Sequence, residues 1–364
     1  VGAMVSTVVA ALTAEQIRGL SDAQIGSLSI TQVAALRSGV VAQLTTLQTA
    51  GFTMTQIAGL TSTQIAALTT AQIQGLSATQ IGGLESTDVA VLSAAQLLAI
   101  TTQQIARIDP SGLTTAQMRQ LTVGQLVGLS SSQIARLTTT QLGGLTALQV
   151  RALTTSEIFA LQSTQISGLS TAQVSALTAL QLARLNVVGL SATQVGVLTV
   201  PQIPALGSAQ IALLTTTQTA GLTSAQVAAL TTTQIQGLGT GSVAAFTTEQ
   251  VKGLTTRLIA GLTVAQVGAL VSTDLALFST VQVTGLTMTQ IAVMTTTQLG
   301  ALGMTQIRAL TTAQLSGLTT LQLGNLSATQ LLALGTAQIR ALTMTQARAL
   351  NPELFAGLTE TQVK

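Results

Sequence analysis

The sequence predicts an all-α solenoid built from single-turn helices, and two observations carry that prediction. The first is an eight-residue repeat, called an octad here, which starts on a Leu or a similar apolar residue and runs from Leu12 to the end of the chain. The second is a Ser or Thr directly after that Leu, followed three residues later by Gln, which is the signature of a helix N-terminus. Such repeats bury their apolar faces against their neighbours, because one unit cannot form a core alone.

Each octad encodes the start of one helix. With the Leu as position 0, position 1 is mostly Thr or Ser, position 4 is mostly Gln, and position 5 is Ile, Val or Leu, as in residues 60–67 and 68–75. Position 1 is then the N-cap, whose hydroxyl accepts from the position 4 amide, while the Gln accepts from the position 1 amide. The residues at positions 0 and 5 can pack as a hydrophobic staple. The apolar residues that replace Leu at position 0 are Phe52, Ile100, Ile108, Phe246, Phe278 and Met294.

The charged residues follow helix polarity. All acidic residues lie at positions 1 to 4, and all basic residues except Arg37 and Arg257 lie at positions 6 or 7. This segregation is what a helix dipole favours, and a β-solenoid gives no reason for it. Pro110 and Pro201 fall in the first helical positions, where no amide donor is needed. Pro204 falls at position 6, where it implies a turn that has already ended.

The residue before each Leu alternates in character. In every second octad, here called the strict octads, position 7 is always Gly or Ala, as at Gly19 and Ala35. The intervening permissive octads also accept larger residues there, such as Gln43, Arg107 and Leu213. This alternation predicts a coil of two octads. The chain would then form about 22 coils, stacked as a nearest-neighbour array. Each coil should turn a corner where one octad passes into the next, at position 7. At the corners of strict octads, called strict corners here, backbones of neighbouring coils should approach each other closely.

One continuous architecture is expected for most of the chain. Residues 1–11 form an atypical first segment, and residues 12–364 a single continuous repeat solenoid. Shortened coils are expected at 108–113 and 185–190, where a unit of five residues replaces an octad. Because the chain begins at Val1 and stops within an octad, we expect it to be a segment or a processed piece of a longer protein. The alternative architecture is a β-solenoid, in which the Gln side chains would form stacked ladders.

The composition argues against an enzyme. Aromatic residues are 1% and charged residues 6% of the chain, and His, Cys, Trp and Tyr are absent. Most nucleophilic, metal-binding and acid–base sites need these residue types, so no catalytic, cofactor-binding or metal-binding residue is predicted. A net charge of +3 does not make a nucleic-acid surface. Polar residues interrupt every apolar stretch, so no transmembrane segment is predicted. The lack of Cys fits an oxidising exterior.

Four features of the sequence are candidate sites. Glu85 and Asp88 could form a weak cation site or an acid–base pair, but an acidic N-cap with an acidic third helical residue explains them better. The segment Asp109-Pro110-Ser111-Gly112 could be a functional loop, but a capped, shortened coil that bends or re-registers the solenoid explains it better. The Arg residues at helix ends do not recur in every coil, and no aromatic residue is available for base stacking. The dense Thr residues resemble ice-binding arrays, but most position 1 Thr already serve as caps.

The repeats resemble a known type of sequence. The octads LTTAQIQGLSATQIGG (68–83) and LTTTQIQGLGTGSVAAFTTEQVKGL (230–254) are similar to the Thr/Gln/Gly/Ala tracts of very large bacterial surface and secreted proteins of the adhesin type. The resemblance covers Leu12 to Lys364 and implies an extracellular, matrix or filament role. The GGxGxD motif of calcium-binding nonapeptide repeats is absent, so calcium-dependent folding is not expected.

The leading functional hypothesis is a structural repeat protein. It would form a stiff extracellular fibre, a biofilm-matrix filament or an adhesin stalk by coil stacking and self-association, laterally or end to end, at the cell surface or outside the cell. No small-molecule substrate and no nucleic acid is expected. The alternative is a non-enzymatic recognition scaffold, whose binding face would use position 6 of strict octads and position 7 of the others. A recognition face should form a contiguous patch, whereas the substitutions scatter along the sequence.

Overall fold

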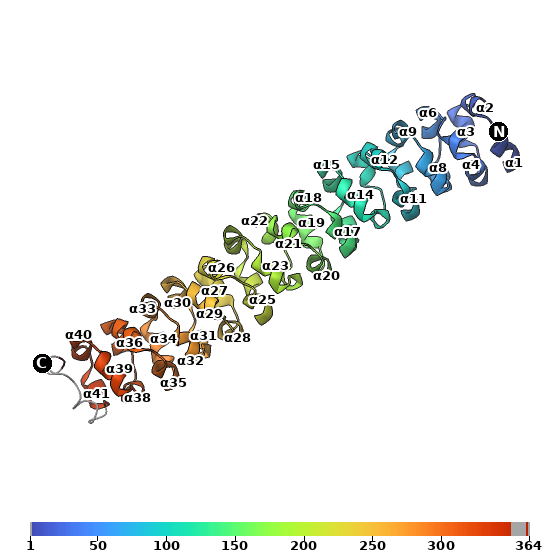
Figure 1. Cartoon of the computed structure of the whole chain (residues 1–364). Helices are drawn as coiled ribbons and strands as arrows, with labels where there is room; N and C mark the ends of the chain where they lie inside the picture. Colours follow the sequence, from blue (N-terminus) through green and yellow to red (C-terminus); the bar gives the residue numbers. More distant parts are fainter. Residues whose placement is uncertain (1, 351–361, 363–364) are drawn as a thin grey trace. The chain divides into compact units, whose positions relative to one another are not determined.

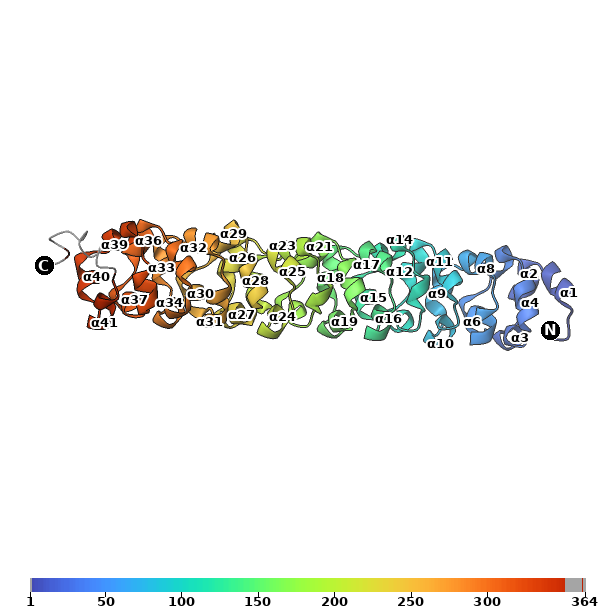
Figure 2. The same cartoon turned by 90° about the horizontal axis from the view of Figure 1, so that it is seen from below.

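The computed structural model describes residues 2–350 and Gln362. The chain divides into two compact units, Val1–Gly189 and Leu190–Lys364, and each is described by itself. Within the described residues all regular structure is helical, and the helices follow one another in regular repeats (Figures 1 and 2). The predicted all-α helical solenoid is confirmed, and the β-solenoid alternative is wrong.

The first unit consists of short α-helices and two 3₁₀ helices, η1 and η2. Their bounds are α1 Ser6–Ala11, α2 Ala14–Arg18, α3 Asp22–Gly26, α4 Ile30–Ala35, α5 Ser38–Val41, α6 Thr46–Ala50, α7 Met54–Ala58, α8 Ser62–Ala67, α9 Thr70–Gly75, α10 Ala78–Ile81, α11 Ser86–Val91, α12 Ala94–Ala99, α13 Thr102–Ile105, η1 Pro110–Gly112, α14 Thr115–Gln120, α15 Val123–Val127, α16 Ser131–Ala135, α17 Thr139–Gly144, α18 Ala147–Ala152, α19 Thr155–Ala160, α20 Ser163–Ser167, α21 Thr171–Ser175, α22 Ala179–Leu182 and η2 Val187–Gly189.

The second unit has the same kind of element. Its helices are α23 Ala192–Gly196, η3 Val200–Ala205, α24 Ser208–Ala212, α25 Thr216–Ala220, α26 Ser224–Ala229, α27 Thr232–Gly237, α28 Thr240–Ala244, α29 Thr248–Gly253, α30 Thr256–Gly261, α31 Val264–Ala269, α32 Ser272–Ala276, α33 Thr280–Thr284, α34 Met288–Val293, α35 Thr296–Gly300, α36 Met304–Ala309, α37 Thr312–Ser316, α38 Thr320–Gly324, α39 Ala328–Ala333, α40 Thr336–Arg340 and α41 Met344–Arg348.

The predicted capping boxes start most of these helices. At α9, the N-cap Thr69 is extended, with φ −74° and ψ 159°, and its hydroxyl accepts from the backbone N–H of Gln72. The side chain of Gln72 in turn accepts from the backbone N–H of Thr69. The helix ends because Leu76 returns to an extended conformation, with ψ 142°, while its N–H donates to the carbonyl of Ile73. Each octad thus begins and ends its own helix.

The core is made by positions 0 and 5 of the octads. Ile73 is 0% exposed and Leu76 is 3% exposed, and the equivalent residues of nearly all described octads are buried in the same way. Phe52, Phe246 and Phe278 replace Leu at position 0 and are also buried, so this position accommodates a phenyl ring. Removing a Leu or Ile side chain from water stabilises the fold by about 1.5–3 kcal/mol. Because single-turn helices are too short to be stable alone, this burial between coils is what maintains them.

A coil contains three octads, and the predicted coil of two octads is wrong. Each helix packs against the third one along the chain, as α3 does against α6 and α6 against α9. The start of α6 at Thr46 follows the start of α3 at Asp22 by three octads, and this spacing recurs along both units. With three octads in a coil rather than two, the same length of chain makes two thirds of the predicted number of coils.

The alternation that suggested two octads is real, but it distinguishes corners rather than coils. At strict positions a Cβ on Gly51 would lie 2.7 Å from the backbone oxygen of Asp22 in the preceding coil. At the permissive position Gly75 the nearest atom is the Cβ of Thr46, 3.5 Å away. Strict and permissive octads alternate along the chain, and each octad stacks on the octad three before it. Because three is odd, a strict octad always stacks on a permissive octad of the coil before it. The composition therefore repeats every two octads while the backbone repeats every three.

The two five-residue units, at 108–113 and 185–190, each hold a short 3₁₀ helix. The helix η1 packs against α11, and η2 packs against α20. The shortening around η1 is visible in the hydrogen bonds that cross it. The side chain of Gln117 bonds the carbonyl of Leu92, 25 residues before it, whereas Gln149 bonds the carbonyl of Leu121, 28 residues before it.

Pro204 corrects one local prediction. The sequence implied that the turn ends before this residue, but η3 continues through Pro204 to Ala205 as a 3₁₀ helix. The 3₁₀ geometry joins residues three apart, so the ring avoids the steric clash that an α-helix would impose with the carbonyl four residues earlier. Helical structure therefore persists with a different hydrogen-bond pattern.

The first segment takes part in the stacking. Helix α1 packs against α4, and Val9 is fully buried although the N-cap Val5 offers no side-chain bond. That residues 12–364 form one continuous solenoid stays a prediction, since the two units are described separately and residues 351–361, 363 and 364 lie outside the described residues.

Candidate functional site

The most regular polar feature of the fold is the Gln at position 4. Gln72 is only 2% exposed, and most of the equivalent Gln side chains are similarly buried. Its Oε1 accepts from the N–H of Thr69 at 2.7 Å, while its Nε2 donates to two carbonyls of the preceding coil, Val41 at 2.9 Å and Leu44 at 2.8 Å. We call this arrangement the glutamine clasp. One side chain caps its own helix and also bonds the end of a helix in the coil before it.

The donor half of the glutamine clasp was missed at the sequence level. A capping box needs only an acceptor at position 4, and Glu would serve as well as Gln. The strong preference for Gln over Glu in this chain was the available signal that a donor is also needed there. The clasp matters because buried carbonyls without donors are costly, at about 1–3 kcal/mol each.

Two clasps are replaced by arginine. Position 4 holds Val40 and Leu258 in two octads, and both side chains are buried and unable to donate. The guanidinium of Arg37 donates instead to the carbonyl of Leu12 at 2.9 Å. In the same way Arg257 donates to the carbonyl of Leu230 at 2.8 Å.

These are the carbonyls that a Gln at position 4 would bond, since each stands at position 0 of the same preceding octad that a clasp would reach. Arg37 and Arg257 are also the two basic residues whose positions departed from helix polarity. Their placement is therefore explained by the hydrogen bond they supply.

Three clasp positions hold a carboxyl group. Glu157 keeps the cap, since its Oε2 accepts from the N–H of Thr154 at 2.6 Å. Burial raises the pKa of Glu157, against the opposing effect of its hydrogen bonds with Thr154. Burial also raises the pKa of Asp274, whose Oδ2 is buried without a hydrogen-bond partner. Asp88 is the third.

Glu85 and Asp88 act as a helix start. The Oδ2 of Asp88 accepts from the N–H of Glu85 at 3.2 Å, and its Oδ1 accepts from the hydroxyl of Ser62 in the preceding coil at 3.1 Å. The pair lies on one turn, as its spacing indicated, but both oxygens of Asp88 face donors rather than an open site. Among the described residues no group of three or more His, Cys, Asp or Glu side chains comes together in a way that could hold a metal ion.

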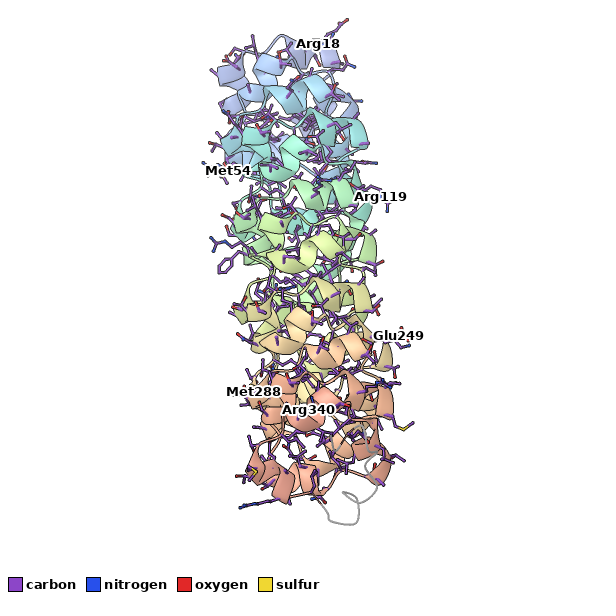
Figure 3. The ribbon with its side chains drawn as sticks, turned by 90° about the vertical axis from the view of Figure 1, so that its left-hand side faces the viewer. Arg18, Met54, Arg119, Glu249, Met288 and Arg340 are labelled. Carbon is purple, nitrogen blue, oxygen red and sulfur yellow. The ribbon has the colours of Figure 1, made fainter. Side chains whose placement is uncertain are left out.

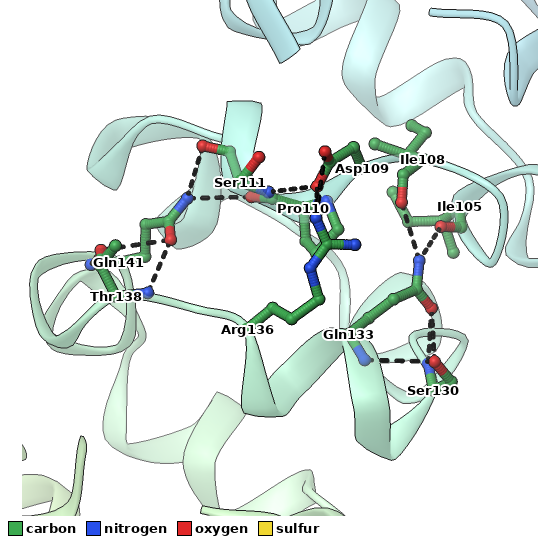
Figure 4. Close-up of polar contacts among 10 residues, drawn as sticks. All are labelled: Ile105, Ile108, Asp109, Pro110, Ser111, Ser130, Gln133, Arg136, Thr138 and Gln141. Carbon is green, nitrogen blue, oxygen red and sulfur yellow. Dashed lines mark hydrogen bonds and ion pairs between the residues drawn. The ribbon is translucent and has the colours of Figure 1, made fainter. Parts of the chain in front are cut away.

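The Asp109 turn is a capped, shortened coil (Figure 4). The Oδ1 of Asp109 accepts from the N–H of Ser111 at 3.1 Å, and Arg136 of the next coil bonds both carboxylate oxygens at 3.1 and 3.2 Å. Burial is the largest single effect on the pKa of Asp109 and opposes ionisation. The bonds from Ser111 and the charge of Arg136 together outweigh it and lower the pKa. Gln141 completes the joint by donating to Pro110 at 2.9 Å.

The other charged residues lie on the outside of each unit. Figure 3 shows Arg18 and Arg119 of the first unit and Glu249 of the second projecting from the ribbon, and Arg340 is exposed as well. Glu249 is paired with Lys252 at 2.7 Å. Within the described part of either unit, no two basic residues at helix ends lie on successive helices of one column, so they do not form a continuous basic track.

Each unit also carries a shallow groove on its outer face. In the first unit a groove of about 510 Å³ is lined by Phe159, Arg184 and the hydroxyl residues Ser131, Thr155 and Ser156. Phe159 is 72% exposed there.

In the second unit a groove of about 380 Å³ is lined by Met304, Leu332, Arg308 and two Thr residues. Both grooves combine exposed apolar side chains, one guanidinium and hydroxyl groups. They include position 6 residues of a strict octad (Phe159, Leu332), a class of position that the recognition hypothesis named.

No helix among the described residues has the length and apolar character needed to cross a membrane. A search of curated proteins found no match to the chain. The family model of the ALTTAQ repeat matches residues 1–38, 111–147 and 223–256. These matches fall on octads in both units, and the chain is therefore a repeat protein with segments similar to the ALTTAQ repeat.

Proposed function

We propose that this repeat protein is a structural segment of an extracellular fibre, filament or adhesin stalk, and that it acts by self-association rather than by catalysis. The observation that carries the proposal is the joint between coils. Position 0 and position 5 residues are buried between coils, and glutamine clasps bond most helices to the coil before them. Such an array transmits load from neighbour to neighbour, because stability is distributed over many equivalent interfaces.

The outer face supports association between copies. It is dominated by uncharged Thr and Ser, and large apolar side chains stand on it, including Leu47, Leu148 and Leu180, each at least 74% exposed. With few charges, little electrostatic repulsion opposes contact between copies. A cell-surface or secreted location is part of the proposal, supported by the absence of Cys and by the resemblance to surface repeat tracts.

Sedimentation velocity and small-angle scattering over a range of concentrations test the proposal. We expect association that increases with concentration and weakens when Leu47, Leu148 and Leu180 are replaced together by Ser. The replacement should leave the circular dichroism unchanged, because these side chains are exposed rather than packed in the core. A monodisperse monomer at all concentrations would overturn the proposal.

A recognition scaffold is the second candidate, favoured by the groove around Phe159 and Arg184. An aromatic face beside a guanidinium suits a peptide that carries an acidic and an apolar side chain. An array of such peptides should bind the chain, and Phe159→Ala and Arg184→Ala should each abolish that binding. If no peptide binds, or if binding survives both substitutions, this candidate fails.

A further inference from the structure

The joints at Glu157 and Asp274 lack the side-chain donor that Gln supplies at most other joints. Glu157 and Asp274 occupy position 4, where Gln elsewhere donates to carbonyls of the preceding coil. Glu157 is 3% exposed and Asp274 is 6% exposed, so water does not replace the missing donor freely. What these two carboxyl groups do at the joint follows from the clasps on either side of them.

The neighbouring clasps define the position of the missing donor at Glu157. The Nε2 of Gln149 lies 2.8 Å from the carbonyl oxygen of Leu121, and that of Gln165 lies 2.6 Å from the carbonyl oxygen of Leu137. The corresponding acceptor for Glu157 is the carbonyl of Leu129, midway between those two. One carboxyl oxygen of Glu157 already accepts from Thr154. A carboxylate has no proton to donate, whereas a neutral carboxylic acid has one O–H.

The joint at Asp274 also lacks a donor to the preceding coil. Its Oδ2 is buried and has no hydrogen-bond partner, and its N-cap residue Val271 offers no hydroxyl. The clasps before and after it, at Gln266 and Gln282, each place Nε2 at 2.8 Å from a carbonyl of the preceding coil. The corresponding acceptor for Asp274 is the carbonyl of Phe246. An ionised carboxylate at this place would face an oxygen with no compensating donor.

No described cation compensates the two carboxyl groups. Helix α19, which carries Glu157, packs against α16 and α22, whose nearest charged residues are Arg136 and Arg184. Arg136 is bound to Asp109, and Arg184 is exposed.

Helix α32, which carries Asp274, packs against α35, which has no charged residue. The octad three before it, in α29, holds the exposed pair Glu249 and Lys252, which bond each other. A proton is therefore the simplest positive charge available to both sites.

We propose that Glu157 and Asp274 are proton-operated clasps. As neutral acids, they donate an O–H to the carbonyl of Leu129 or Phe246 and bond their coil to the preceding one. When they ionise, the donor is lost and two oxygens oppose each other, so the joint opens locally. Each unit then carries one acid-closed joint, at Glu157 or Asp274, whereas most of the other joints are closed by Gln, which does not respond to pH.

The direction of the pH dependence follows from burial. A buried carboxyl whose pKa is raised binds its proton more tightly in the folded state than in the unfolded chain. Its contribution to stability is complete below the unfolded pKa, at about pH 4. That contribution is lost as pH rises through the higher folded pKa. The two joints should therefore loosen between acidic and neutral pH.

Amide hydrogen exchange of the full chain between pH 4 and pH 7 tests this proposal, after correction for the intrinsic exchange rate. We expect exchange in α16, α19, α29 and α32 to be about tenfold faster at pH 7 than at pH 4, because each joint loses one hydrogen bond to a buried carbonyl. Glu157→Gln and Asp274→Gln should each abolish the difference at its own joint alone. Because both substitutions restore the common residue, they should not impair folding.

A converse variant and a control sharpen the test. Gln149→Glu should create a new pH-dependent joint, whereas Glu249→Gln, on the surface, should change nothing at either joint. The proposal is overturned if the pH dependence survives Glu157→Gln and Asp274→Gln. It is also overturned if Na⁺, K⁺ or Ca²⁺ at fixed neutral pH restores slow exchange in the unaltered chain, since the carboxylates would then bind a cation rather than a proton.

Discussion

At the scale of single residues, the Gln at position 4 has two roles that differ in how readily they can be predicted. The capping role is confined to one octad and could be predicted, because donor and acceptor are close in the sequence. The donor role joins Gln72 to Leu44, 28 residues away, and depends on how many octads make a coil. No local pattern contains that number. For the same reason the positions of Arg37 and Arg257 could not be explained from the sequence. Each donates to a carbonyl of the preceding coil that has no Gln donor.

Replacing a clasp should be costly, and a matched substitution nearby should not. Gln72→Met keeps the side-chain volume but removes the donor to the Leu44 carbonyl and one of the two donors to the Val41 carbonyl, so we expect a loss of about 1–3 kcal/mol. Gln74→Met, two positions along on the exposed face, should change stability by less than about 0.5 kcal/mol. Urea unfolding monitored by circular dichroism would measure both. Equal effects of the two substitutions would contradict a structural role for the clasp.

The arginine substitutes can be tested by rescue. Arg257→Ala removes the donor to the Leu230 carbonyl and should destabilise the second unit by about 1–2 kcal/mol. Adding Leu258→Gln to the same chain places a clasp at the usual position and should restore most of that loss. Arg119→Ala, at an exposed helix end, is the control and should have little effect. Thermal unfolding of these variants beside the unaltered chain would show whether the rescue occurs, and a double variant no better than Arg257→Ala would refute the explanation.

At the scale of helices and corners, position 7 of one octad packs over position 2 of the octad stacked against it, and the atoms in contact differ between the two kinds of corner. At most strict corners a Cβ on Gly would meet backbone atoms of the stacked residue, as for Gly221 on Ala192 and Gly253 on Ser224. At permissive corners the contact is with a branched side chain, as for Gly261 on Thr232. The sequence predicted the close approach but assigned it to the wrong repeat, because helix boundaries are local whereas the number of corners in a coil is set by how coils close.

A side chain at a strict corner should separate two coils. A Cβ on Gly221 would lie 2.3 Å from the backbone oxygen of Ala192, so Gly221→Leu should destabilise the second unit by about 1–3 kcal/mol. Gly268→Leu is the matched control, because nothing lies within 4 Å of its Cβ and Leu favours helix over Gly. We expect this control to be neutral or stabilising in differential scanning calorimetry. A destabilised Gly268→Leu with an unaffected Gly221→Leu would reverse the assignment of the corners.

At the scale of the whole molecule, stability is expected to be a sum over similar joints, and the composition of each joint depends on the order of strict and permissive octads. The octads, their helices and their caps could be predicted from the sequence. The closure of three octads into a coil could not, because every octad presents the same Leu and Ile to whichever neighbour it meets. The number of octads in a coil follows only from contacts in the structure, such as those between α3 and α6 or between α6 and α9.

Deletions of different length should separate coil size from corner order. Removing residues 294–309 or 294–325 takes out an even number of octads, so strict octads still stack on permissive ones. Removing residues 294–317 takes out one full coil but stacks the strict octad 326–333 on the strict octad 278–285, with permissive octads on permissive ones beside it. Each misfitted corner should cost about 1–3 kcal/mol. We expect the melting temperature to fall more for the deletion of 294–317 than for the shorter deletion of 294–309 or the longer deletion of 294–325. A steady fall with length would contradict the importance of corner order.

The mismatch between a three-octad coil and a two-octad alternation has a consequence for how such a chain can change in length. Within a unit, gaining or losing two octads leaves the core, the clasps and the corner order satisfied, yet it turns every later residue by two thirds of a revolution about the coil axis. Three such steps bring the later surface back to its starting direction. A repeat protein of this type can therefore re-aim an exposed side chain such as Phe159 by duplication alone, without a single substitution in its interior.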